Sequence, residues 1–333
     1  MNWKLALGFS IVLLLLLLEV FLGSVSLSAH QVVEILGDGE HPLRPLIDSR
    51  ILRAFTAAIA GAALGLCGLT MQTFFRNPLA GPSVLGITSG ASLGVSLLMM
   101  LSGGLGFVWQ NWGIGAPLAV AGAAFLGALL ILAILLISTK KLRSNTSILI
   151  FGLMMGYITS ALVSVLQQQS SKDSLRSFVL WGMGDFSDTT FLQCILLAAV
   201  VLLGSLLIYW KRRDLDAWLF GADYAQSMGV NVQQVRWTLI VVVGLMAGLV
   251  TAFCGPIAFL GLSVPHLVRG VFKGGKHQHL IFKTLLFGAA LAMLCDLIAR
   301  LPGWDVSLPL NAVTSALGAP VVIWIILKGR RVF

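Results

Sequence analysis

The sequence contains few charged residues. Asp, Glu, Lys and Arg make up 11% of its 333 residues, whereas 58% are hydrophobic; an average soluble domain carries about 25% charged residues. With a mean hydropathy of +0.95, the apolar surface is too large to be hidden in one soluble core. This composition excludes a soluble enzyme and predicts an integral membrane protein. Apolar runs reach the ~20 residues that cross a bilayer as a helix, so we expect an all-α protein; a membrane barrel would show alternating strands of about 10 residues.

Motifs for metals, cofactors and catalysis are also missing. The five histidines form no metal-binding pair on a clear helix, and the cysteines show no CxxC spacing. Residues 270–277 nearly spell a phosphate-binding loop, but no strand precedes them and His277 replaces the hydroxyl residue that holds magnesium. We therefore expect no metal, no cofactor, no nucleotide site and no catalytic residue. The cysteines stand singly in apolar runs, at Cys67, Cys194, Cys254 and Cys295.

Ten apolar segments are candidate membrane-spanning helices. The first is too long to be the apolar core of a cleaved signal, so we interpret it as an uncleaved span. Together the segments predict a single transmembrane domain over residues 1–333. The expected spans are 5–27, 52–73, 83–102, 115–138, 147–168, 189–210, 234–253, 256–272, 280–300 and 309–327.

The distribution of lysine and arginine predicts the orientation in the membrane. If the N-terminus is cytoplasmic, sixteen of the 22 cations lie in cytoplasmic segments and six in outer segments, as the positive-inside rule requires. Both termini are then cytoplasmic. The net charge of +9 is explained by this topology and by contact with anionic lipid, with no nucleic-acid partner. The six outer cations are Arg44, Arg50, Arg53, Lys172, Arg176 and Arg300.

Irregular backbone is expected to interrupt the hydrophobic chain at residues 75–94. Pro78 and Pro82 break a helix, and a break inside a bilayer persists only where protein or a water-filled cavity satisfies the freed amides. Residues 81–86, Gly-Pro-Ser-Val-Leu-Gly, resemble residues 255–261, Gly-Pro-Ile-Ala-Phe-Leu-Gly, with one insertion. The spans before them run in opposite directions. The pair therefore predicts a weak inverted repeat with broken helices, which is a transporter signature.

Three hydrophilic segments connect the spans. We expect an outer loop at residues 28–50 with a short helix near residues 31–36, and a second outer loop at residues 169–188. The third segment is cytoplasmic, and its pattern predicts a helix at residues 214–228 that ends at Gly229.

Charged residues within or near the spans are further candidates. Glu19 lies inside the first span, where an ionisable group is a functional candidate by default, here for proton coupling. Asp296 and Arg300 stand at i and i+4 and can pair locally. Arg50 and Arg53 share one face of the outer end of the second span. They serve either as interfacial anchors or as receivers of carboxylates from a soluble partner.

Four longer motifs carry a family resemblance. They are Arg50-x-x-Arg53, Met71-Gln72-x-x-Phe75-x-Asn77-Pro78-Leu79-Ala80-x-Pro82-x-x-Leu85-Gly86, Gly255-Pro256-Ile257-x-Phe259-x-Gly261-Leu262-x-Val264-Pro265-His266-Leu267-x-Arg269, and Leu317-Gly318-Ala319-Pro320-x-x-Ile323-Trp324. With them the chain resembles, over nearly its whole length, the permease subunits of bacterial ABC importers for iron-siderophore, haem and cobalamin, the FecCD or BtuC-like family. The resemblance implies ten helices in a BtuC-like permease fold. It also implies a two-fold dimer with a second copy or a paralogous permease, two cytoplasmic ATPase subunits and an extracytoplasmic substrate-binding protein.

The resemblance also implies roles for particular residues. The docking arginines for the binding protein are Arg50, Arg53 and Arg300, and the cytoplasmic gate is formed by Asn77, Leu79, Asn145 and Thr146. The segment at about residues 214–230 resembles the helices that seat in the ATPase. Its expected coupling residues are Leu219, Gly221, Ala222, Asp223, Ala225, Met228 and Gly229; the family often has a leucine where Met228 stands.

The expected function is that of a permease in the bacterial cytoplasmic membrane. It imports a metal chelate, and the first candidates for this cargo are a ferric siderophore and haem. ATP is hydrolysed in a separate subunit. One alternative is a cobalamin importer. Another, from a different class, is a proton-coupled secondary transporter that uses Glu19, and a third is a structural scaffold.

Overall fold

The computed structural model describes residues 3–22, 28–37, 41–101, 116–142, 144–272, 275–300 and 307–327. All regular elements in these ranges are helical. They are α1 (Trp3–Phe21), α2 (Ala29–Gly37), α3 (Arg44–Phe75), the 3₁₀ helix η1 (Pro82–Leu85), α4 (Ile87–Leu101), α6 (Ala116–Thr139), α7 (Asn145–Gln168), α8 (Lys172–Gly182), α9 (Phe191–Trp210), α10 (Arg212–Trp218), α11 (Ala222–Ser227), α12 (Val232–Cys254), α13 (Leu260–Phe272), α14 (His277–Ala299) and α15 (Leu310–Leu327).

The expected all-α membrane architecture is confirmed. Seven described helices are long and apolar enough to cross a bilayer, namely α1, α3, α6, α7, α9, α12 and α14. Three shorter apolar helices, α4, α13 and α15, occupy the remaining predicted spans. Two of the short helices, α4 and α13, directly follow the two breaks that contain Gly81-Pro82 and Gly255-Pro256. They are short because part of each predicted span is irregular backbone.

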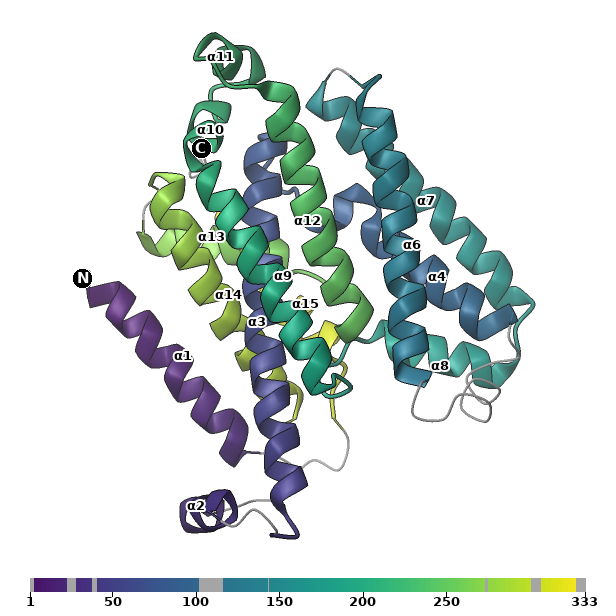
Figure 1. Cartoon of the computed structure of the whole chain (residues 1–333), viewed down its shortest axis with the longest axis vertical. Coiled ribbons are helices and arrows are strands. Elements are labelled where there is room, and N and C mark those ends of the chain that lie inside the picture. Colours follow the sequence, from purple (N-terminus) through teal and green to yellow (C-terminus); the bar gives the residue numbers. More distant parts are fainter. Residues whose placement is uncertain are drawn as a thin grey trace.

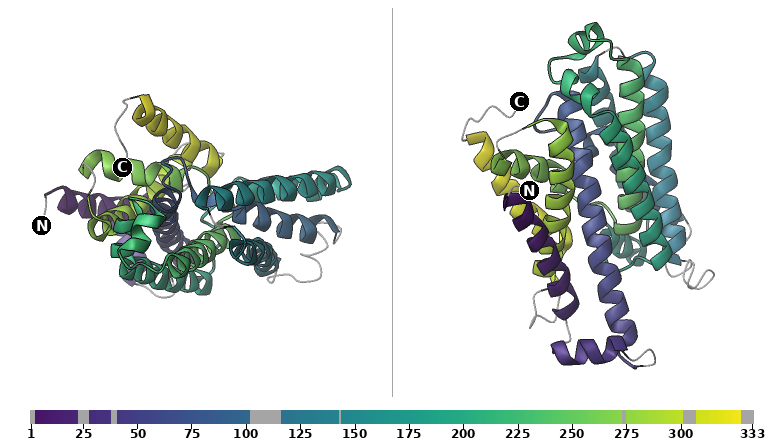
Figure 2. Two further views of the ribbon diagram at one scale, coloured as in Figure 1. Left: turned by 90° about the horizontal axis from the view of Figure 1, so that it is seen from above. Right: turned by 60° about the vertical axis from the view of Figure 1, so that its left-hand side comes forward.

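Helix α3 is the central element of the bundle (Figure 1). It has 32 residues, which at 1.5 Å per residue gives a length of about 48 Å. One end of the molecule carries α10 and α11, and the opposite end carries α2 and α8 (Figure 1); we call these the α10–α11 end and the α2–α8 end. Helices α1, α13 and α14 pack on or beside α3. Helices α4, α6 and α7 form a second group, which α12 joins to α3 (Figures 1 and 2).

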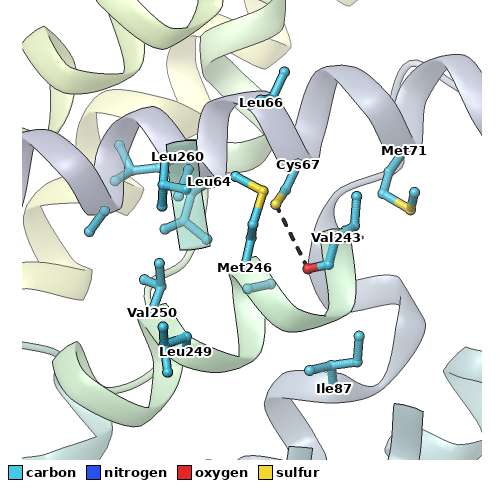
Figure 3. Close-up of a cluster of buried hydrophobic side chains, with 14 of the residues drawn as sticks. Leu64, Leu66, Cys67, Met71, Ile87, Val243, Met246, Leu249, Val250 and Leu260 are labelled. Atoms are coloured by element: carbon cyan, nitrogen blue, oxygen red, sulfur yellow. Dashed lines mark hydrogen bonds between the residues drawn. The ribbon is translucent and has the colours of Figure 1, made fainter. Parts of the chain in front are cut away.

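Small residues let the helices of the core approach closely. The α carbon of Gly68 on α3 lies so close to α13 that an added Cβ would stand 1.6 Å from the carbonyl oxygen of Gly261, so only glycine fits. Figure 3 shows the adjoining apolar cluster, in which Met246 and Val250 of α12 lie beside α3. There the thiol of Cys67 donates to the carbonyl of Val243 over 3.8 Å. The four cysteines are free and buried.

The structure corrects three details of the connecting segments. The expected single helix at residues 214–228 is two short helices, because Gly221 adopts a φ of 115° between α10 and α11. The second outer loop contains α8, whose N-cap is Ser171. Helix α3 begins at Arg44, earlier than expected, with a proline in its first turn. The short helix near residues 31–36 and the helix end at Gly229, with a φ of 85°, are confirmed.

Five of the cations used to predict the orientation lie outside the described residues. They are Arg143, Lys273, Lys328, Arg330 and Arg331.

Candidate functional site

The first break forms a compact turn at the α10–α11 end. Arg76 closes α3 in the left-handed region with a φ of 49°. The side chain of Asn77 then accepts a hydrogen bond from the amide of Leu79 over 2.9 Å. Leu79 is half exposed, at 50%, although its side chain is apolar. The turn therefore presents an exposed leucine side chain at its tip.

Helix α13 holds this break from the side. His266 is hydrogen-bonded to the carbonyl of Pro78 over 2.8 Å. The side-chain amide of Gln72 donates to the carbonyl of Leu262 over 3.2 Å and accepts from Arg269 over 3.0 Å. The two similar segments of the sequence also touch, since a Cβ added at Gly261 would stand 2.6 Å from Cδ of Pro82.

The start of α7 lies beside the end of α3. Ser144 caps α7 by accepting from the amide of Ser147, and the next residue, Asn145, donates to the carbonyl of Phe74 over 2.8 Å. Thr146 is exposed. The structure thus brings Asn145 close to the break that contains Asn77 and Leu79. It also shows that the amide of Asn145 is committed to the neighbouring helix.

The predicted coupling residues form an exposed elbow made of α10, α11 and the turn between them. Ala225 is buried in the elbow, and Leu219, Gly221 and Ala222 are half-buried. Asp223, Met228 and Gly229 are exposed. Two aromatic side chains that were not predicted, Phe220 and Tyr224, are 69% and 49% exposed, and their rings lie 5.2 Å apart. The elbow therefore carries an apolar surface at its tip.

Contacts at the base of this elbow were missed from the sequence. Trp218 is fully buried, donates to the carbonyl of Phe74 over 3.0 Å and stacks on the Phe74 ring. Asp216 accepts from the backbone amide of His277 over 3.0 Å and lies 2.6 Å from its Nδ1. Burial by itself would raise the pKa of Asp216, but the hydrogen bonds from His277 outweigh this and hold it below its usual range. No sequence motif marks these residues, since the partners are distant along the chain.

The arginines expected to dock a binding protein lie towards the α2–α8 end, and all three contact other parts of the chain. Arg50 is buried and donates to the carbonyls of Val20 and Phe21 at the end of α1. Arg53 makes a bidentate pair with Asp296 of α14, at 2.8 and 2.9 Å, and also reaches Asp185 at 3.2 Å.

Arg300 completes an ion network at this end. It pairs with Asp296 over 2.9 Å, which confirms the expected i, i+4 pair, and also with Glu19 of α1. The network joins Glu19, Arg300, Asp296, Arg53 and Asp185, and so ties α1, α3, α14 and the α8–α9 loop together. Glu19 is fully buried, so the water access expected for a proton-coupling group is not seen in this chain by itself.

A cavity of about 710 Å³ lies next to the network. Its lining includes Arg53, Asp185 and Asp188 together with the aromatic residues Trp181 and Phe253. Burial raises the pKa of Asp188, and the nearby Asp185 raises it further. The cavity is mainly apolar with a polar wall, and no group of three or more potential metal ligands is found among the described residues.

Comparison with known proteins identifies relatives of this chain. The profile of the FecCD transport family matches residues 11–328. The vitamin B12 import system permease protein BtuC of Vibrio cholerae serotype O1 is 35% identical over 283 residues, covering 84% of this chain and 82% of the relative. The BtuC protein of Shigella boydii serotype 18 is 34% identical over 99% of this chain and 96% of its own.

A solved structure shows the same fold. A structure described as an inward-facing conformation of a metal-chelate type ABC transporter matches with a TM-score of 0.84 and 26% identity. The match covers 98% of this chain and 100% of the other. Together these similarities show that the chain is an ABC transporter permease subunit that is not itself catalytic, and that it belongs to the FecCD transport family.

Proposed function

We propose that the chain is one half of the permease of an ATP-driven importer that moves a metal chelate into the cell. The observation that carries the proposal is the placement of the predicted sites at opposite ends of one helix. Arg50 and Arg53 lie on the first turns of α3, and Asn77 and Leu79 follow its last turn. A helix of about 48 Å spans a bilayer with its headgroup regions, which measure about 40–45 Å. Docking and gating are thus linked by a continuous element.

In this proposal the α10–α11 end faces the cytoplasm and the α2–α8 end faces outward, with both termini cytoplasmic. The exposed apolar tip of the elbow, with Phe220, Tyr224 and Met228, fits the groove of an ATPase subunit. Leu79 and Thr146 are both exposed in the single chain. A second copy, or a paralogous permease, packed across a two-fold axis would cover them and close the path there.

Docking of a binding protein on these arginines requires a further step. Arg53 and Arg300 are already paired with carboxylates of this chain, so carboxylates of the binding protein must replace them. Asp185 is the accessible member of the network, with a side chain 47% exposed, whereas Asp296 is buried. We infer that Asp185 is the carboxylate that a docking partner displaces from Arg53.

Affinity measurements test this docking scheme. Asp185→Asn should strengthen association with the substrate-binding protein, because it removes the competitor, and Arg53→Gln should weaken it and reduce its salt dependence. Arg176→Gln, which changes an exposed arginine of α8 outside the network, is the control. Weaker binding by Asp185→Asn, or unchanged binding by Arg53→Gln, would reject the scheme.

The cargo is the finer part of the proposal. A ferric siderophore or haem is the first candidate, since iron chelates are the commonest cargo that the family resemblance implies. Cobalamin is the second candidate, and a specific observation favours it, because the BtuC relatives are named as vitamin B12 permeases.

Import by the complete complex distinguishes the cargo candidates. Permease, ATPase subunits and binding protein reconstituted in vesicles with internal ATP are offered a ferric siderophore, haem and cobalamin in turn. Accumulation of one of the iron chelates supports the first candidate and accumulation of cobalamin the second. Failure of all three in a complex whose ATPase is active would contradict import of these chelates.

Proton coupling through Glu19 has little support. Glu19 is paired with Arg300 and fully buried, and membership of a family of ABC importers points to ATP as the energy source. We therefore assign Glu19 to the ion network, where it helps to hold α1 against α14.

A further inference from the structure

Three helices meet at one backbone carbonyl at the α10–α11 end. The carbonyl oxygen of Phe74, in the last turn of α3, accepts from Trp218 of α10 over 3.0 Å and from Asn145 of α7 over 2.8 Å. The rings of Phe74 and Trp218 lie 5.5 Å apart at an angle of 27°. Both side chains are fully buried. A displacement of α10 therefore cannot occur without moving the end of α3 or breaking this contact.

A second contact ties α10 to the same turn of α3. Asp216 is held by the amide and Nδ1 of His277, and Nε2 of His277 lies 2.9 Å from the hydroxyl of Thr73. His277 is 1% exposed and Thr73 is fully buried. If the ring donates from Nδ1 to the carboxylate, Nε2 accepts from Thr73. The elbow thus contacts two consecutive residues directly before the break, Phe74 through Trp218 and Thr73 through His277.

The other side of the elbow leads into α12, which reaches α7. Arg236, in the second turn of α12, is 5% exposed. It donates to the carbonyl of Leu142 over 3.0 Å and to the side-chain oxygen of Asn145 over 3.3 Å. Asn145 therefore stands between the two routes: its oxygen faces Arg236 and its amide faces Phe74.

We propose that Trp218 and Arg236 are the positioning residues through which the elbow moves the gate, Trp218 by pulling the end of α3 and Arg236 by pulling the start of α7. The inference rests on the proposed function, since it assumes that an ATPase moves the elbow. It assigns transmission to buried residues at the base of the elbow, whereas the exposed tip only binds the ATPase. Because both routes converge on Asn145, the two sides of the gate move together.

Two conservative substitutions test the routes separately. Trp218→Phe keeps an aromatic ring beside Phe74, removes the indole donor and also removes the volume of the five-membered ring at a buried position. Arg236→Lys keeps the charge, but an ammonium does not reproduce the planar fork that reaches both Leu142 and Asn145. Trp210→Phe, at a 74% exposed position in α9, is the matched control. All three are studied in the full complex in vesicles, with ATP hydrolysis and import measured on the same samples.

We expect Trp218→Phe and Arg236→Lys each to raise the ATP hydrolysed per substrate imported by about two- to tenfold, the range that loss of one hydrogen bond can supply. The Trp210→Phe control should keep the wild-type ratio. A merely structural role would lower the amount of assembled complex and leave the ratio unchanged. An unchanged ratio in both test variants would overturn the inference.

A conformational readout separates this inference from the proposed function. Spin labels at Leu79→Cys or Thr146→Cys report the distance across the permease dimer, and the four native cysteines are buried. We expect ATP to change this distance in the parent and less in the two test variants. Import is measured on the unlabelled parent, because the labels stand at gate positions. If the labelled parent shows the distance change but the unlabelled parent imports no chelate, the cargo assignment fails and the inference still stands. If the variants respond like the parent, the inference fails. If Trp218→Phe does not assemble, Asp216→Asn takes its place with the same expected result.

Discussion

Removal of Arg300 gives the sharpest prediction about the ion network. Arg300 is 13% exposed and pairs with both Asp296 and Glu19. In the variant Arg300→Met, Asp296 keeps its bidentate pair with Arg53, but Glu19 keeps no ion-pair partner among the described residues. Glu19 is fully buried, and an ionised carboxylate without a partner is costly there.

The expected loss follows from this geometry. Removing one member of a buried ion pair destabilises by about 3–5 kcal/mol, because the remaining charge is left uncompensated. Glu19→Gln should cost less, since Arg300 still holds Asp296. In the double variant no buried charge is left unpaired, so the two effects should not add. We expect a coupling free energy of about 2 kcal/mol between these sites.

Reversible unfolding of the purified permease in mixed micelles measures these differences. Arg176→Met, at an exposed position of α8 outside the network, is the control and should change the free energy of unfolding by less than about 0.5 kcal/mol. If Arg300→Met behaves like this control, or if the two substitutions add without coupling, the account of a buried network at this end is wrong.

Three further predictions concern other parts of the chain. Gly68→Ala should destabilise by about 1–3 kcal/mol or more, since the added methyl group meets the backbone of Gly261. Gly122→Ala should not, because a Cβ added there meets no described atom of another part of the chain within 4 Å. Unfolding titrations compare the two. Asp216 has a depressed pKa in the folded state, so its stabilising contribution is present above the unfolded pKa of about 3.9 and is lost as the pH falls through the folded value. Melting temperatures between pH 6 and pH 3 should therefore fall more steeply in the parent than in Asp216→Asn; parallel curves would argue against it. Asn311→Ala removes hydrogen bonds from its side chain to the carbonyls of Gly182 and Pro256. We expect hydrogen exchange to become faster at the second break, and unchanged protection there would contradict this.

The spans and the breaks could be predicted from the sequence because their causes are local. Long apolar runs locate the spans, and Pro78 and Pro82 locate the first break, since the ring of proline removes a donor. The pair between Asp296 and Arg300 follows from helical spacing alone. Local signals also existed for two features that were missed: Pro45 in the first turn of α3 and the N-cap Ser171 of α8 mark helix starts.

The networks could not be predicted, because their members are far apart in the chain. Arg53 and Asp296 are separated by 243 positions, and Trp218 and Phe74 by 144. Only packing of the helices brings them together, and no spacing rule encodes it. The break at Gly221 could not be predicted either, because a glycine inside a periodic segment is compatible with a continuous helix. Its φ of 115° accompanies the packing of α10 and α11 on the neighbouring helices.

The central claim is that ATP, used by a partner, drives import through this chain. Its most direct test is uptake of the chelate held by the binding protein into vesicles that contain the complete complex. The account predicts uptake with internal ATP, none with an ATPase subunit unable to hydrolyse it, and none driven by a proton gradient alone. Uptake that follows the proton gradient without ATP would contradict the account.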